Sequence, residues 1–497
     1  MKKIRFLIFA LCLCMLLPLL IACGNEEKPE GPNDQTDLDG ETRETAKDTI
    51  PDGYDLENQT ITIWFHGQKD DALGIEGTTD IVFSKIHERN LSVQERLNVD
   101  LQFMEGTSAR WQDSPEELRR EIQTMSCAFE AVFAANNRLI GYKLFNYFHD
   151  LNDSNYIDLN EDWWYEDAIM ELAVDNYNYR FLYGDLHISN IGRAGTVYYN
   201  KELYSQYVSP TKEKDELYQV VLDGKWTLDE FTRLAKKGYV SKGGDGSNDI
   251  YGYDHHQTAN MDFLRESVGI RLYDRNDQGM PIFNFKDEKS VAFITKINDF
   301  FHNSPGILAS NINKSYAPVF TDSQVLFQIN ILSTVMNDAM REMKDDFGIL
   351  PMPKWDEEQE EYKTLIYSAS CTAGIPVSTD IDRANEEVSA VIEALCSESY
   401  RSVSLAFYET ALKAAYNRDD QSAQMIDIIT AQHPTVKSTL TKNFVFEYSS
   451  SLGNIGSIFT TLAKERSNNF VSQYDSIIGS AEQGLRELID LYKSGKI

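Results

Sequence analysis

The most constraining feature of this sequence is an alternation of strand and helix patterns that begins near residue 60. Thr60 to Phe65 is a run of β-branched and aromatic residues closed by His66-Gly67, which is typical of a buried strand. Apolar residues then recur at helical spacing over residues 82–97, and a second strand pattern follows at Val99 to Phe103. A strand, a helix and a strand in succession predict the start of a parallel α/β sheet.

The chain is long enough for two lobes. It has 497 residues, of which 42% are apolar and 25% are charged, as in globular proteins. Single cores stop growing at about 250–300 residues, so we expect the chain to divide. Helical spacing becomes more frequent toward the C-terminus, where apolar residues recur at Leu485, Leu488, Ile489 and Tyr492.

The charge excludes two classes of partner. Asp and Glu number 78 against 47 Lys and Arg, which gives a formal net charge of −31. Such a surface repels phosphate backbones and anionic headgroups. We therefore expect no nucleic-acid partner and no membrane contact through surface charge, and a ligand that is neutral or cationic.

The N-terminus predicts export. Lys2, Lys3 and Arg5 precede an apolar run over residues 6–22, which is the pattern of a signal peptide. The run ends in Leu20-Ile21-Ala22-Cys23-Gly24, which resembles a bacterial lipobox. That resemblance implies cleavage before Cys23, acylation of Cys23 with lipid such as palmitate, and anchoring at the outer face of the cytoplasmic membrane. An uncleaved anchor helix is the alternative.

Residues 23–57 are predicted to be a lipidated, disordered tether. They are rich in Glu, Asp, Thr, Gly and Pro, and their few apolar positions have no period. Beyond the tether only Cys127, Cys371 and Cys396 remain, without metal-type spacing, so no disulfide framework is implied. A bridge between Cys371 and Cys396 stays open, with buried free thiols as the alternative.

The middle of the chain resembles a known family. A tryptophan pair at 163–164, Tyr183-Gly184-Asp185, and the run Val197 to Leu203 containing Tyr199-Asn200-Lys201 follow one another, and Phe347 to Lys354 comes later. Together these stretches resemble the extracellular solute-binding proteins of bacterial ABC transporters, the group that includes maltodextrin- and oligosaccharide-binding proteins. The resemblance covers most of the predicted mature chain.

The resemblance implies a two-lobed, type II periplasmic-binding-protein-like α/β fold whose chain passes between the lobes three times. Val197 to Asn200 matches the first passage, Val325 to Asn330 the second, and Ser397 to Val403 the third. The implied domains are a signal peptide at 1–22, the tether at 23–57, lobe one at 58–196 with 331–397, and lobe two at 200–328 with 402–497.

The resemblance also implies function. It suggests a receptor, not an enzyme, that closes over a small solute, expected to be a sugar, and delivers it to an ABC permease. We expect a monomer that needs no cofactor or metal. A surface-anchored glycoside hydrolase and a sensor or adhesin without transport remain alternatives, because paired carboxylates cannot be located from the sequence.

Candidate ligand residues follow from position and residue type. Trp163 and Trp164 are adjacent and should face opposite ways on an extended segment, so we expect one of them to line the cleft. Phe65 and His66 end the first strand, where open α/β sheets bind ligands. The other candidates lie near the predicted crossings and are Tyr183, Asp185, Arg193, Asn330 and Tyr367.

The loop Asp245 to Asp249 has oxygen-bearing side chains at alternate positions, as a calcium loop does. Ile250 stands where an EF-hand requires glycine, which favours a plain turn.

Overall fold

The protein is described here from a computed structural model, which covers residues 43–67, 69–125, 128–256, 259–310, 318–416, 421–442, 444, 448 and 452–497. The chain divides into residues 1–45 and a compact unit of residues 46–497. Of the first unit the structure describes the turn η1 (Arg43–Thr45), so the predicted signal peptide, Cys23 and most of the predicted tether lie outside the described residues, as does Cys127. No described helix is long and apolar enough to cross a membrane.

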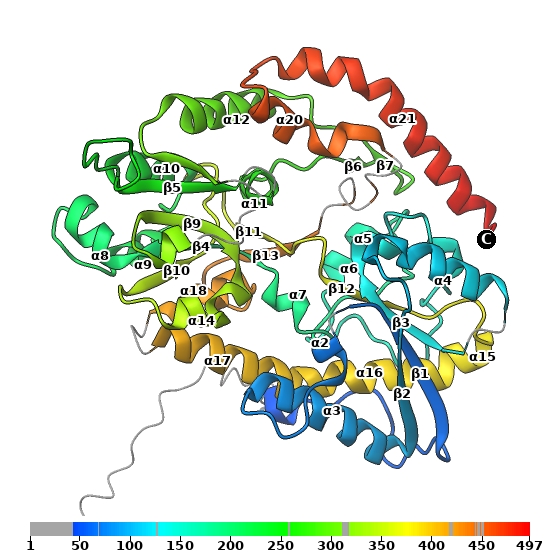
Figure 1. The fold of residues 1–497 in the computed structure, drawn as a ribbon. Helices are drawn as coiled ribbons and strands as arrows, with labels where there is room; N and C mark the ends of the chain where they lie inside the picture. The colour runs from blue at the N-terminus through cyan, green and yellow to red at the C-terminus, as the bar shows by residue number, and fades with distance from the viewer. Residues whose placement is uncertain are drawn as a thin grey trace, which may run out of the picture. The chain divides into compact units, whose positions relative to one another are not determined.

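The first sheet carries the strands that open the compact unit. Its order is β12-β3-β1-β2, with β1 parallel to β2 and β3, and β12 antiparallel to β3 (Figure 1). The strand bounds are β1 Gln59–Phe65, β2 Val99–Glu105, β3 Ala131–Ala135 and β12 Cys371–Gly374. The predicted strand, helix and strand are confirmed, and the helical crossover between β1 and β2 allows their parallel pairing.

Helix α3 (Ile81–Leu97) makes this crossover. Asp80 caps it, because one of its carboxylate oxygens accepts the N–H groups of Val82 and Phe83. Asn98 ends it in the left-handed conformation, at φ 47°. The cap fixes the N-terminal turn of α3 beside the loop that follows β1.

The second sheet has the order β10-β4-β9-β5-β8. β4 is antiparallel to β9 and β10, whereas β5 is parallel to β8 and β9. The strand bounds are β4 Gly195–Asn200, β5 Tyr251–His256, β8 Ile307–Ser310, β9 Val325–Ile331 and β10 Phe347–Leu350. Strands β4 and β9 are the first two predicted crossing segments, and they pair with each other.

The third predicted passage is a helix. α16 (Ser389–Glu398), the π-helical turn η8 (Ser399–Val403) and α17 (Ser404–Tyr416) follow one another without a break. In Figure 1 this run, coloured yellow to orange, passes from beside β1 and β2 of the first sheet to below the strands of the second sheet.

The predicted lobe ranges stay a prediction, and strand pairing differs from them at two places. β10 lies within the range assigned to lobe one, yet it pairs with β4 in the second sheet. β13 (Ser438–Thr441) lies within the range assigned to lobe two, yet it pairs with β11 (Tyr362–Leu365) from the range assigned to lobe one. Short-range sequence patterns do not reveal such pairings, because the partners are far apart in the chain.

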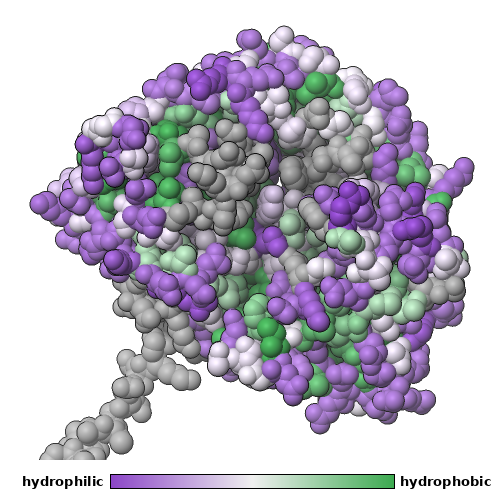
Figure 2. Space-filling model, viewed as in Figure 1, coloured by the Kyte–Doolittle hydropathy of each residue, from purple (hydrophilic) through white to green (hydrophobic). Residues whose placement is uncertain are grey.

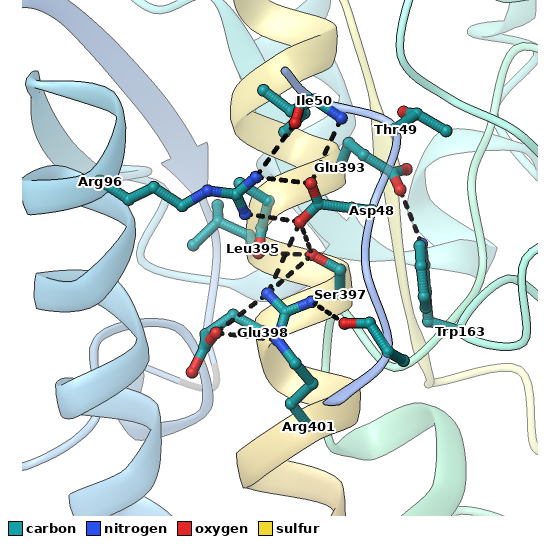
Figure 3. Close-up of polar contacts among 12 residues, drawn as sticks. Asp48, Thr49, Ile50, Arg96, Trp163, Glu393, Leu395, Ser397, Glu398 and Arg401 are labelled. Carbon is teal, nitrogen blue, oxygen red and sulfur yellow. Dashed lines mark hydrogen bonds and ion pairs between the residues drawn. The ribbon is translucent and has the colours of Figure 1, made fainter. Parts of the chain in front are cut away.

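The last part of the predicted tether is ordered, so the prediction of a disordered segment up to residue 57 is wrong for residues 46–57. Ile50 and Leu56 are buried, and the ring of Tyr54 lies 5.2 Å from that of Tyr156. Asp48 binds Arg96 of α3 and Ser397 of α16 (Figure 3). We call residues 46–50 the strap.

The remaining elements cover the two sheets and connect them, and hydrophilic residues dominate the face shown in Figure 2. The α-helices are α2 Lys69–Leu73, α4 Ser114–Gln123, α5 Asn136–Leu139, α6 Glu166–Leu172, α7 Ser189–Gly192, α8 Lys201–Leu203, α9 Glu216–Leu222, α10 Leu228–Lys237, α11 Ala259–Ser267, α12 Glu288–Asn298, α13 Pro318–Thr321, α14 Asp338–Arg341, α15 Ile381–Arg383, α18 Ser422–Ile429, α20 Ile458–Lys464 and α21 Phe470–Ser494. The other short elements are η2 Trp111–Asp113, η3 Phe145–Tyr147, η4 Tyr204–Val208, η5 Asp299–Asn303, η6 Leu332–Met336, η7 Ala384–Val388, η9 Gly453–Ser457, β6 Asp274–Arg275 and β7 Pro281–Ile282.

Candidate functional site

A cavity of about 410 Å³ lies where the loops of the first sheet meet the end of β9. Its wall comes from the β1–β2 connection, from α7 with its flanking residues, from the segment after β9, and from α17. The lining residues are Asp71, Asp80, Val82, Phe83, Ile188, Ser189, Gly192, Arg193, Ile331, Ser333, Met336, Asn337, Asp338, Arg341 and Phe407. This volume is within the range of small-molecule sites. A second hollow, between Phe145 and Tyr492, has a volume of only about 10 Å³ and has room for one water at most.

Asp71 and Arg193 place opposite charges on the wall of this cavity. Burial raises the pKa of Asp71 to about 6, and the positive charge of Arg193 opposes that rise. Nδ1 of His187 lies 3.9 Å from Asp71, but burial lowers the pKa of His187 to about 3, so the imidazole is neutral and the contact is not an ion pair. At neutral pH Asp71 therefore presents a mainly ionised carboxylate.

The other lining carboxylates are occupied by the protein itself. Asp80 caps α3 through the N–H groups of Val82 and Phe83. Asp338 pairs with Arg341 at 3.4 Å, and Arg341 also donates to the carbonyl of Met336 at 2.5 Å. Among the carboxylates that line this cavity, Asp71 is the one that serves neither as a cap nor in a salt bridge.

The rest of the wall combines hydroxyl and amide groups with apolar surface. Ser333 and Asn337 supply the polar groups, and Gly192 brings the backbone of α7 close to Ser333. The apolar members are Val82, Phe83, Ile188, Ile331, Met336 and Phe407. A wall of this kind suits a ligand that has both hydroxyl groups and flat C–H faces.

Three predicted residues lie at or beside the cavity. Arg193 lines it, and Asn330 immediately precedes the lining residue Ile331. The N–H of Tyr367 donates to the carbonyl of Arg193 at 3.0 Å. Asn330 is buried, and its side-chain oxygen accepts the N–H of Ile331, while its amide nitrogen has no partner among the described residues.

The tryptophan pair does not line the cavity, contrary to the expectation for one of its members. Both indoles are buried, and their Nε1 atoms donate to the two carboxylate oxygens of Glu393 at 2.9 and 2.8 Å; Figure 3 shows the bond from Trp163. The two rings do not point in opposite directions because the segment is a turn rather than a strand, with Trp164 held against Gly184 by an isolated bridge.

The remaining predicted ligand residues also lie elsewhere. Phe65 is buried, and the ring of His66 stacks beside Trp64, with Nε2 3.1 Å from the carbonyl oxygen of Ser108. Tyr183 is buried beneath the ammonium group of Lys442, which lies 4.7 Å from its ring centre. Asp185 is buried and accepts the hydroxyl of Tyr165 at 2.5 Å. Their side chains stabilise the interior instead of facing the cavity.

Sequence reasoning missed Asp71, Phe83, Ser333, Asn337 and Phe407. The strand-end rule that selected Phe65 and His66 points to the connection that reaches the cavity, but the lining residues of that connection lie farther along it, on α2 and α3 and at the cap of α3. Ser333 and Asn337 follow β9 and could have been found by applying the same rule to the second crossing. Phe407 lies at least 70 residues farther along the chain and carries no local signal.

Ser189 and His187 do not form a catalytic pair with Asp71. Nδ1 of His187 lies 2.8 Å from the Ser189 hydroxyl and accepts the N–H of Ser189. Asp71 faces the same nitrogen, whereas a serine triad uses the two ring nitrogens for different partners. The Ser189 hydroxyl also accepts the N–H of Cys371, which fixes it as a structural group.

Two questions left open by the sequence are answered by local contacts. Cys371 and Cys396 are both buried free thiols. The Asp249 carboxylate accepts the N–H of Lys242 at 2.7 Å and the hydroxyl of Tyr239 at 2.9 Å. These bonds stabilise the turn itself, as expected for a plain turn and not for a calcium loop. Within the described residues, no three His, Cys, Asp or Glu side chains gather as metal ligands do.

No protein-family profile and no curated protein matches this sequence. Solved structures do match. The sugar-binding protein MalE from Xanthomonas citri is 11% identical, with 87% of this chain and 99% of that chain covered and a TM-score of 0.57. UgpB from Mycobacterium tuberculosis, in complex with glycerophosphocholine, is 13% identical over 86% and 98%, with a TM-score of 0.52. The ABC substrate-binding protein Lmo0181 from Listeria monocytogenes, in complex with cycloalternan, is 14% identical over 88% and 99%, with a TM-score of 0.50.

At these identities the likeness concerns the fold. The chain has the two-lobed, type II fold of the solute-binding proteins of ABC transporters, and this prediction is confirmed. The cavity lies beside β4 and β9, which are the first two predicted crossing segments, because Arg193 lies two residues before β4 and Ile331 ends β9.

Proposed function

We propose that this chain is a receptor that captures a small solute between its two lobes and delivers it to an ABC permease. The observation that carries the proposal is the cavity of about 410 Å³, whose wall joins loops of the first sheet to the segment after β9. A solute that touches both sides stabilises their approach, because a ligand shifts a conformational equilibrium toward the state it binds better. The likeness to transporter-associated binding proteins supports the same role.

A carbohydrate is the ligand class that the wall fits best. Sugar hydroxyls can donate to the Asp71 carboxylate and accept from Arg193, while a C–H face packs against Phe83 and Met336. MalE is described as a sugar-binding protein, but the UgpB structure contains glycerophosphocholine. The fold therefore does not select the ligand, and the assignment rests on the cavity wall.

A ligand panel tests the receptor function. Sugars, amino acids and short peptides are added to the purified chain, and thermal unfolding is followed. We expect a sugar to raise the melting temperature, since a ligand at 100 times its Kd contributes about 2.7 kcal/mol. Turnover of an oligosaccharide would favour the hydrolase alternative. Stabilisation by amino acids or peptides but by no sugar would contradict the carbohydrate assignment.

The Asp71 carboxylate is expected to make binding pH-dependent. Because burial raises its pKa to about 6, it becomes protonated below that pH and can no longer accept two ligand hydroxyls. The affinity of the bound sugar should then fall by up to about tenfold per pH unit below 6. Calorimetric titration between pH 4.5 and 8 measures this dependence.

Substitutions at two aspartates separate ligand binding from local structure. Asp71→Asn should weaken binding about 10- to 100-fold at pH 7.5, the loss expected for a charge-assisted hydrogen bond, and should remove the pH dependence. Asp80→Asn is the matched control, because asparagine also caps helices and Asp80 uses its oxygen for α3. Equal losses in both variants would contradict the role assigned to Asp71.

We also propose that the chain is held on the membrane by lipid on Cys23 and by the segment that follows it. The lipobox-like residues that end at Cys23 and Gly24 support this arrangement. Cys23→Ser should move the protein from the membrane fraction to the soluble fraction of cells that express it, as measured by immunoblot. Retention of this variant on the membrane would favour an uncleaved anchor. In a separate experiment, ligand uptake is measured in cells that contain the permease, and absence of uptake would favour a sensor or adhesin.

A further inference from the structure

A short arm reaches from the half of the molecule built on the second sheet to the half built on the first. The arm comprises residues 271–282 and contains the hairpin of β6 and β7. It is preceded by α11 and followed by α12, and the ring of Phe285 at its base lies 5.1 Å from Tyr474 of α21 and 6.3 Å from Phe459 of α20. Because α11 directly follows β5 of the second sheet, the root of the arm belongs to the second half.

The tip of the arm binds the C-terminal end of α6, which belongs to the first half. α6 follows Tyr165, whose N–H donates to the carbonyl of Tyr183, and the adjacent Leu182 bridges to Ala373 of β12 in the first sheet. The guanidinium of Arg275 donates to the carbonyls of Met170, Glu171, Ala173 and Val174, at 2.8 to 3.4 Å. These are terminal carbonyls that a helix leaves without intrahelical partners.

The contact is favourable in both geometry and charge. A cation at a helix C-terminus satisfies the orphan carbonyls and stabilises the negative end of the helix dipole. The hydroxyl of Tyr273 adds a bond to the carbonyl of Glu171, and Arg271 pairs with the Glu171 carboxylate at 3.0 Å. The Tyr273 ring lies within 5.7 Å of both guanidinium groups. At the hairpin turn, Gly279 approaches so closely that a Cβ there would collide with the side chain of Asn176.

The outer part of the arm is the part that can leave this seat. β6 and β7 have two residues each, Ile282 is exposed, and Arg275 is only half-buried, so water can replace its bonds to the carbonyls, whereas Leu272 and Tyr273 nearer the base are buried. We propose that residues 271–282 are a latch that docks on α6 and holds the two halves in the closed arrangement. In a receptor that closes over its ligand, such a latch raises the apparent ligand affinity, because it raises the population of the closed state. This consequence rests on the proposed receptor function.

The test uses the purified chain without ligand, so its outcome is independent of whether a ligand has been found. Arg275→Ala removes the guanidinium, and Gly279→Val lifts the hairpin from Asn176 by steric conflict at a backbone φ of 74°. Lys286→Ala is the matched control, because Lys286 lies just beyond the arm and pairs with Asp475 at an exposed site, at 2.5 Å. Circular dichroism verifies that each variant is folded.

Two measurements are made on each protein: the radius of gyration by small-angle scattering, and hydrogen exchange in peptides covering 170–176 and 274–282. For Arg275→Ala and Gly279→Val we expect a larger radius of gyration and exchange at least about fivefold faster in both peptides, with no change for Lys286→Ala. α21 still links the two halves through Tyr474 and Tyr492, so the opening is partial. Faster exchange with an unchanged radius of gyration would show that the arm moves locally without opening the halves, and would overturn the latch. No change in either measurement would also overturn it.

Discussion

Replacing Glu393 by alanine is expected to lower the free energy of unfolding by about 3–5 kcal/mol. The side chain is fully buried in α16, and its two oxygens accept the indole N–H groups of Trp163 and Trp164. Its loss leaves two buried donors without an acceptor and creates a cavity, each of which costs about 1–3 kcal/mol. Urea unfolding followed by tryptophan fluorescence and circular dichroism measures the change.

Glu393 is also expected to make stability depend on pH. Burial raises its pKa from the ordinary 4.5 to about 8, with the indole bonds acting in the opposite direction. Because the folded-state pKa lies above the unfolded one, this contribution to stability is complete below about pH 4.5 and is lost as the pH rises through 8. The loss is up to about 5 kcal/mol.

Glu393→Gln is the control for this titration. It cannot titrate, so its stability should be flatter between pH 5 and 8 than that of the unchanged protein, although its amide nitrogen cannot accept an indole N–H. Equal pH slopes for the two proteins would mean that Glu393 is already ionised in the folded protein over this range, as it is in the unfolded chain, and would contradict the prediction.

Asp48→Ala is expected to lower the free energy of unfolding by about 2–4 kcal/mol. The Asp48 carboxylate is 1% exposed and accepts two bonds from Arg96, at 2.5 and 2.6 Å, and one from Ser397, while Arg401 lies 3.5 Å away (Figure 3). Without it, the guanidinium groups of Arg96 and Arg401 lose the carboxylate that they share, which is costly when the groups are partly buried, and Glu398, which pairs with Arg401 at 3.0 Å, is left to offset both charges. Urea unfolding again measures the loss.

Burial acts to raise the pKa of Asp48, but bonds from Arg96 and Ser397 and the charges of Arg96 and Arg401 outweigh it and hold the pKa below the ordinary 3.8. The folded-state pKa is depressed, so the contribution of Asp48 is present above about pH 4 and is lost on acidification. Asp52→Ala, in an exposed residue nearby, should have little effect. A comparable loss in this control would contradict the role of the strap.

The same network predicts where the chain can be shortened. A chain that begins at residue 46 keeps the strap, including the bond from Arg401 to the carbonyl of Ala46 at 3.0 Å. A chain that begins at residue 58, the predicted start of lobe one, loses Asp48 together with the buried Ile50 and Leu56. Relative to the full chain, we expect the chain that begins at residue 58 to have a markedly lower melting temperature, and the chain that begins at residue 46 to have an unchanged one.

The segment 46–57, which contains the strap, shows where composition alone leads to a wrong prediction. Residues 46–57 have too few apolar positions to order themselves, and the sequence therefore predicts a disordered tether. They are ordered because Arg96 and Arg401 come from helices more than 300 residues apart in the chain and meet at one point. The sequence around an acidic residue in a polar segment does not indicate that two distant arginines will bind it.

The sequence by itself determined the class of fold, because strand and helix periodicities are local and the crossing motif at Val197 to Lys201 is contiguous. It also predicted Arg193, Asn330 and Tyr367 as residues near the crossings, and in the structure Arg193 lines the cavity while the other two lie beside it. Only the tertiary structure decided which side chains line the cavity, since Asp71, Ser333 and Phe407 come from separate segments. It also decided the position of Trp163 and Trp164, because both indoles donate to the buried carboxylate of Glu393, which lies about 230 residues away in the chain.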